Sequence, residues 1–118
     1  MNPINAKIAE FSDTEWEAYF GDPEKKITQA AAPACVATLI AWAGQEAGLP
    51  ILTFGGHIYL YKETHYVSES LSEVIYEALK RIKIPLAYVN DSDFVKKVEK
   101  NIYLASEKHR NNVNMNPR

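Results

Sequence analysis

The sequence predicts an α+β fold, or an α/β variant of it, built as one small domain around a central buried helix. Three observations lead to this class. The chain has 118 residues, of which 47% are hydrophobic and 24% charged, which is the size and composition of one globular domain. Residues 33–61 are the most apolar stretch and predict a helix followed by a tight hairpin. Capping signals place further helices on both sides of this stretch.

A short helix is predicted over residues 13–20. Ser12 and Glu15 have the spacing of a capping box, in which each side chain bonds an otherwise free backbone N–H group. Phe11 and Trp16 have the spacing of a hydrophobic staple around the same helix start. A Gly-Asp-Pro sequence then ends the helix, because glycine and proline both disfavour its continuation.

The central helix is predicted over residues 34–47. Pro33 takes its first helical position, and Gly48 followed by Pro50 ends it. Apolar residues occur nearly all round this segment, which is typical of a helix buried on several sides. The preceding residues, 23–31, predict only a weak turn or two of helix.

An antiparallel meander is predicted after the central helix. Strands over residues 51–54 and 58–61 are joined by a Gly-Gly pair, which tolerates the positive φ angles of a tight turn. Residues 64–67 are a candidate for a third strand. Because side chains alternate along a strand, Tyr59 and Tyr61 are expected on one face of this sheet.

The second half of the chain predicts a helix, a strand and a final helix. A period of about 3.6 residues predicts an amphipathic helix over residues 71–83. The apolar run 84–89 predicts a buried strand, and an Asn-Asp pair caps the last helix. The order is then α-α-β-β-(β)-α-β-α, with flanking helices on a mixed sheet of three or four strands. The domain is expected to cover residues 1–109, with a frayed tail over 110–118.

Composition argues against several function classes. A net charge of −2 does not fit a general nucleic-acid binder, and no apolar run approaches the length of a membrane span. Residues 1–10 lack the pattern of a signal peptide. A single cysteine forms no internal disulfide, so we expect a cytoplasmic location. No membrane partner, metal or cofactor is expected.

Charge is unevenly distributed along the chain. Residues 1–24 carry mostly acidic side chains, whereas residues 96–118 carry mostly basic ones. Such polarity is compatible with a charged partner or with head-to-tail association into a homodimer, and also with solvated faces at opposite ends of the molecule.

The candidate catalytic residues are Cys35, His57 and Gln29. Cys35 lies one turn inside the predicted start of the central helix, where the helix dipole lowers a thiol pKa. His57 opens the strand after the Gly-Gly turn. A cysteine at a helix start facing a histidine at a strand start resembles papain-like enzymes, in which Gln29 would correspond to an oxyanion glutamine. The resemblance implies a small Cys-His hydrolase or transferase; the alternative is a buried structural thiol.

A second resemblance concerns the element order over residues 33–89. The order α-β-β-β-α-β is similar to the core of restriction-endonuclease-like nucleases, which hold a metal with one strand-borne acid and an E-x-K sequence. Residues 50–52 lack the acid, and Lys62-Glu63 lacks the E-x-K order. The resemblance therefore implies a nucleic-acid-binding accessory protein with a catalytically incomplete core.

Individual residues suggest two further kinds of site, a nucleic-acid contact and a zinc site. Lys96, Lys97 and Lys100 are candidates for nucleic-acid contact, with tyrosines of the meander as stacking partners. The alternative is ordinary helix surface. His57, Glu63 and His65 have side chains that suit zinc, but their spacing matches no known motif, and exposed hairpin histidines are the simpler interpretation.

The leading hypothesis is a small protein-binding or regulatory protein, such as an inhibitor, immunity or accessory factor, that acts by masking a partner. Seven tyrosines and two tryptophans are many for this length, and both types are favoured interface anchors. The expected contact residues lie on the first helix and on the meander: Glu15, Trp16, Tyr19, Phe20, Tyr59 and Tyr61.

Overall fold

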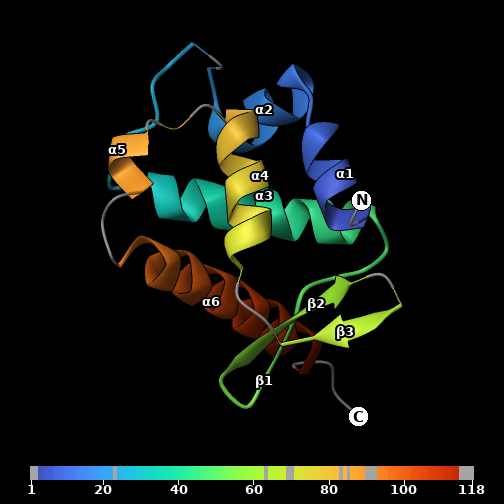
Figure 1. Ribbon diagram of the computed structural model, residues 1–118. Helices are drawn as coiled ribbons and strands as arrows, with labels where there is room; N and C mark the ends of the chain where they lie inside the picture. The colour runs from blue at the N-terminus through green and yellow to red at the C-terminus, as the bar shows by residue number, and fades with distance from the viewer. Residues whose placement is uncertain are drawn as a thin grey trace.

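The α+β class is confirmed by a computed structural model (Figure 1). The structure describes residues 3–22, 24–62, 64–68, 71–82, 84, 86–89 and 93–114. Its elements are, in chain order, α1 (Pro3–Ala9), α2 (Asp13–Phe20), α3 (Ala32–Glu46), β1 (Leu52–Phe54), β2 (His57–Lys62), β3 (His65–Val67), α4 (Ser72–Ile82), α5 (Leu86–Val89) and α6 (Phe94–Asn114).

The central helix α3 organises the helical part of the molecule. It packs against α1, α4 and α6, and eight of its residues are buried, which agrees with its nearly uniform apolar sequence. Gly44 provides a close approach at its C-terminal end, where a Cβ atom would lie 3.0 Å from the carbonyl oxygen of Leu49. In Figure 1, α4 crosses α3 on one side and α6 runs below it.

Helix α1 completes the core on the side of α3 and α4. Its Ile4 and Ile8 are fully buried, and their spacing of four residues places them on one helical face. The sequence analysis did not predict this helix. Its seven residues are too few for a strong periodic signal, so packing against α3 and α4 stabilises it more than propensity does.

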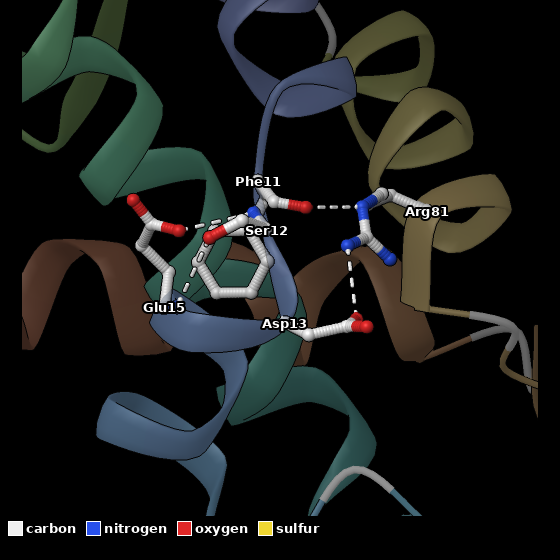
Figure 2. A network of polar contacts seen from close by, with 5 residues as sticks. All are labelled: Phe11, Ser12, Asp13, Glu15 and Arg81. Atoms are coloured by element: carbon white, nitrogen blue, oxygen red, sulfur yellow. Dashed lines mark hydrogen bonds and ion pairs between the residues drawn. The ribbon is translucent and has the colours of Figure 1, made fainter.

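Helix α2 begins as the sequence predicts. The Glu15 N–H group donates to the Ser12 hydroxyl at 3.3 Å, and the Ser12 N–H group donates to the Glu15 carboxylate at 3.1 Å. Arg81 of α4 secures the same segment: its Nε donates to the Phe11 carbonyl oxygen at 2.6 Å, and its Nη2 lies 3.8 Å from Asp13 Oδ1 (Figure 2). The capping box fixes the helix start, and Arg81 fixes that start to α4.

The three strands form an antiparallel meander in the order β1-β2-β3. The β1–β2 turn contains Gly55 and Gly56, both with positive φ, as the Gly-Gly pair predicts. The candidate third strand forms as β3. The sheet lies beside the C-terminal half of α6 and makes its main helical contact there, through β1 (Figure 1).

The predicted fourth strand is wrong. Residues 86–89 form the short helix α5 instead, so the sheet of the described chain is antiparallel and not mixed. An apolar run of six residues fits a buried strand or a buried helical turn equally well by periodicity. A strand also needs a neighbour for its backbone hydrogen bonds, and α5 lies away from the sheet (Figure 1).

The last helix is longer than expected. Helix α6 continues to Asn114, five residues into the stretch expected to be a frayed tail, and residues 115–118 lie outside the described chain. The Asn90-Asp91 cap expected for this helix also lies outside it. Across the helices that the structure describes, none is long and apolar enough to cross a membrane.

Candidate functional site

The aromatic residues of α2 serve mainly to attach this helix to the core. Trp16 is 7% exposed, and its ring lies 5.4 Å from that of Phe20, centroid to centroid. Phe11 stands at the centre of the group, 4.9 Å from the Trp42 ring of α3 in an edge-on arrangement. Of the predicted contact residues on α2, only Tyr19 exposes more than half of its surface. Asp13 and Glu17 of this helix are exposed, whereas Glu15 is half-buried and its carboxylate accepts from the Ser12 N–H group.

The predicted tyrosines of the meander belong to a larger surface. The register pairs Leu52 with Tyr59, Phe54 with His57, and Tyr61 with Tyr66. Directly paired residues share a face of an antiparallel sheet, and residues two apart on one strand do as well. One face therefore carries six side chains, which we name the aromatic sheet face: Leu52, Phe54, His57, Tyr59, Tyr61 and Tyr66.

The aromatic sheet face points to solvent, and the opposite face points to the core. On the opposite face Thr53 and Leu60 are buried, whereas Leu52 is 44% and Phe54 74% exposed. Exposure decreases from the hairpin end of the aromatic sheet face to the tyrosine end, where Tyr59, Tyr61 and Tyr66 are half-buried. Two large apolar side chains thus stand in water at one end of an ordered row of aromatic rings.

The tyrosine end of this face is held rigidly. The Tyr61 and Tyr66 rings meet edge to face with centroids 5.4 Å apart, and the Tyr66 hydroxyl donates to the Pro50 carbonyl oxygen at 2.9 Å. Burial raises the pKa of Tyr66, and the neighbouring Tyr61 adds to the rise, so the hydroxyl stays protonated and able to donate. Ordered rings lose little conformational entropy when they bind a partner.

The hairpin end is anchored to α6. The Gly56 N–H group donates to the Tyr103 hydroxyl oxygen at 3.2 Å, which joins the β1–β2 turn to the helix. Between the turn and α6 lies a pocket of about 600 Å³, which we name the hairpin–α6 pocket. Its lining includes His57, Ile58, Lys96, Glu99, Lys100 and Tyr103.

A second groove lies between α3 and α6. It has a volume of about 500 Å³, and its lining includes alanines of α3, Tyr19 of α2 and Leu104 of α6. Leu104 also lines the hairpin–α6 pocket, so the two hollows adjoin along α6.

The candidate catalytic residues do not form a constellation. Cys35 is half-buried in the first turn of α3, whereas His57 begins β2 and lines the hairpin–α6 pocket, and the start of α3 lies away from the sheet (Figure 1). Burial raises the pKa of the Cys35 thiol, opposite to the lowering that the helix dipole led us to expect. Gln29 is exposed in the segment before α3. Among the described residues, no hydrogen bond joins any two of these three side chains.

The residues considered as zinc ligands are also not brought together. His57 pairs with Phe54 at one end of β2, and His65 pairs with Lys62 at the other, five residues away. At about 3.3 Å per residue, this separation exceeds the span of any single metal centre. Glu63 lies outside the described residues, and no metal-binding group occurs among those described.

The lysine candidates lie on α6. Lys96 and Lys100 line the hairpin–α6 pocket, whereas Lys97 does not. On α4, Lys80 pairs with Glu77, and Arg81 holds the start of α2.

The sequence analysis did not identify Leu52, Phe54, Tyr103 or Leu104. The first two could have been found, because a hairpin centred on the Gly-Gly pair places them opposite Tyr59 and His57. The role of Tyr103 depends on a contact 47 residues away in sequence, for which the chain carries no local signal.

No protein family model, curated protein or solved structure matches this chain.

Proposed function

We propose that this protein is a small protein-binding module that covers a partner through the aromatic sheet face. The observation that carries the proposal is the exposure of Phe54, 74%, beside Leu52 on the same face. A phenyl ring in water contributes little to this fold, since its contacts are to solvent. Apolar side chains that gather on one exposed face are typical of a protein contact surface.

The composition of the face fits side-chain recognition of a protein. Tyrosine and phenylalanine bury large areas with few rotatable bonds, which is why they anchor interfaces. Strand addition at the sheet edges fits less well, because β1 and β3 are three residues long and offer few backbone groups to a further strand. The partner is therefore expected to lie across the face rather than extend the sheet.

The proposed action is masking, as by an inhibitor, immunity or accessory factor. The separated positions of Cys35 and His57 and the raised thiol pKa favour binding over Cys-His chemistry. A cytosolic setting fits a chain with one cysteine. A homodimer would use the same face if two copies met there, and this is one outcome that the experiment below separates.

A nucleic-acid partner is the alternative that shares the same residues. Aromatic rings on a sheet serve as stacking platforms for unpaired bases. Such sites also track the phosphate backbone with many cations, whereas here the pocket lysines are few and the net charge is −2. The charge therefore favours a protein.

Site-specific photo-crosslinking tests the proposal. A photoreactive phenylalanine analogue replaces Phe54 in one protein and Tyr76 in a matched control, which is 58% exposed on α4 and outside the sheet. Each protein is irradiated in cells of its source, and adducts are identified by mass spectrometry with and without nuclease.

We expect one protein adduct at position 54 that is nuclease-resistant and absent at position 76. An adduct with a second copy of this chain would identify the face as a dimer interface. Loss of the adduct after nuclease treatment would favour the nucleic-acid alternative. Equal adducts at both positions would contradict the proposed face.

A further inference from the structure

The hairpin–α6 pocket has the size and chemistry of a small-ligand site. Its volume of about 600 Å³ falls within the range of about 300 to 1,000 Å³ that is common for such sites. The lining residues from α6 are Lys96, Glu99, Lys100, Tyr103 and Leu104, and their spacing of three and four places them on one helical face. The β1–β2 turn forms the opposite wall.

Hydrogen-bond donors dominate the polar lining. Lys96 and Lys100 are one helical turn apart and exposed, and neither ammonium group forms an ion pair with a described residue. The Tyr103 hydroxyl oxygen accepts from the Gly56 N–H group, which leaves its own O–H group able to donate. Two lysines and a hydroxyl donor outnumber the single carboxylate of the described lining, Glu99, and so favour an anionic ligand.

Glu99 narrows the class of ligand. It lies between the two lysines in sequence and lines the same pocket, so an extended polyanion would meet its negative charge. A carboxylate is instead a good acceptor for ligand hydroxyl groups. Ile58 and Leu104 supply apolar surface for the carbon skeleton or a base.

We propose that this pocket binds a sugar phosphate, either free or as part of a mononucleotide. The dianionic phosphate lies between Lys96 and Lys100 and accepts from Tyr103, and Glu99 accepts from the sugar hydroxyls. The site goes beyond the proposed protein-binding function, because Lys96, Glu99 and Lys100 belong to α6; His57 is the residue that the pocket shares with the aromatic sheet face.

Calorimetric titration of the full chain tests this site with four probes: ribose 5-phosphate, adenosine 5′-monophosphate, ribose and adenosine. We expect binding of at least one phosphorylated probe and no binding of its phosphate-free counterpart. The double variant Lys96→Gln/Lys100→Gln should weaken that binding at least about tenfold, because it removes both charges that face the phosphate. The matched control Lys97→Gln removes a neighbouring charge outside the pocket and should change affinity less than about twofold.

Several results would contradict the binding of a sugar phosphate in the hairpin–α6 pocket. Failure of both phosphorylated probes to bind at millimolar concentration would remove it. Equal binding of adenosine and its monophosphate would remove the role of the lysines, as would equal losses in the Lys97→Gln and double variants. A single-stranded oligonucleotide that binds more tightly than the mononucleotide, with a steep salt dependence, would replace it with a nucleic-acid surface. Unfolding midpoints in urea confirm that each variant is folded.

Discussion

Arg81 joins three parts of the molecule through one side chain. It donates to the backbone of Phe11, lies near the Asp13 carboxylate, and places its guanidinium carbon 5.8 Å from the centroid of the Phe11 ring (Figure 2). The hydrogen bond to a buried residue matters more than the ion pair, because the Asp13 side chain is 87% exposed and well screened.

Arg81→Ala should lower the free energy of unfolding by about 2 to 3 kcal/mol, since it leaves the Phe11 carbonyl without its charged donor. Asp13→Asn should change it by less than about 0.5 kcal/mol. Lys80→Ala, the neighbouring exposed cation on α4, serves as the matched control with a similarly small effect. Urea denaturation measures all three, and equal losses for Arg81→Ala and Lys80→Ala would show that the bond to Phe11 contributes nothing.

The reactivity of the Cys35 thiol tests the nucleophile hypothesis. Burial raises the pKa of its thiol, so the thiolate fraction between about pH 7 and 9 is smaller than in the unfolded chain. Alkylation by iodoacetamide should therefore be slower in the native protein than in urea across this range. A native thiol that reacts faster than the unfolded one would restore the nucleophile hypothesis.

Local sequence signals predicted individual residues well where the contact is local. The Ser12–Glu15 capping box spans three residues and forms as expected. The hydrophobic staple predicts the contact of Trp16 with Phe11, which forms with ring centroids 6.5 Å apart, but it does not predict the packing of Phe11 on Trp42 of α3, which lies far along the chain. A short aromatic helix looks the same in sequence whether its rings face the core or a partner.

At the scale of elements, Gly44 shows how α3 meets the chain that follows it. A Cβ atom there would lie 3.0 Å from the Leu49 carbonyl oxygen and 3.3 Å from the Ile51 side chain. The Leu49 N–H group donates to the Gly44 carbonyl oxygen at 2.8 Å, so the backbone has little freedom to retreat.

Gly44→Ala should therefore destabilise the protein by about 1 to 2 kcal/mol, although alanine is the better helix former by about 1 kcal/mol. Gln45→Ala, at the next and exposed position, should be close to neutral. Thermal or urea unfolding measures both variants. A Gly44→Ala protein more stable than the parent would mean that the turn after α3 adjusts freely.

Elements with strong periodicity or turn chemistry were predicted, and elements decided by tertiary packing were not. The helix α4, the hairpin and the end of α3 follow from period, paired glycines and proline. Helix α1 and helix α5 do not. Both helices are short, so tertiary surroundings decide their secondary structure. Helix α1 packs against α3 and α4, and α5 lies far from any strand with which it could pair.

At the scale of the whole molecule, helices and sheet have separate tasks. The helices α1, α3, α4 and α6 build the core, and the small sheet turns its Thr53–Leu60 side toward it. The sheet's other side is left to solvent with Phe54 and Leu52 uncovered. The acidic side chains of α2 lie on a different element from Lys96 and Lys100, which line the pocket beside the hairpin.

The sequence predicted two contact residues of the aromatic sheet face, Tyr59 and Tyr61. Alternation placed Tyr59 and Tyr61 on one face, and the register of the hairpin adds Leu52 and Phe54 to it. The sequence did not predict which face of the sheet is exposed to solvent, because the alternation along a strand does not say which of its two faces meets the helices.

The measurement that tests the proposed function most directly is the affinity of Phe54→Ser for the partner captured at that position. Wild-type protein, Phe54→Ser and Tyr76→Ser are titrated against the partner, after urea unfolding has verified that all three are folded. We predict a loss of at least about tenfold for Phe54→Ser and less than about twofold for Tyr76→Ser, because an aromatic anchor that becomes buried in a contact carries much of its binding energy. Equal affinities for the three proteins would contradict a partner on the aromatic sheet face.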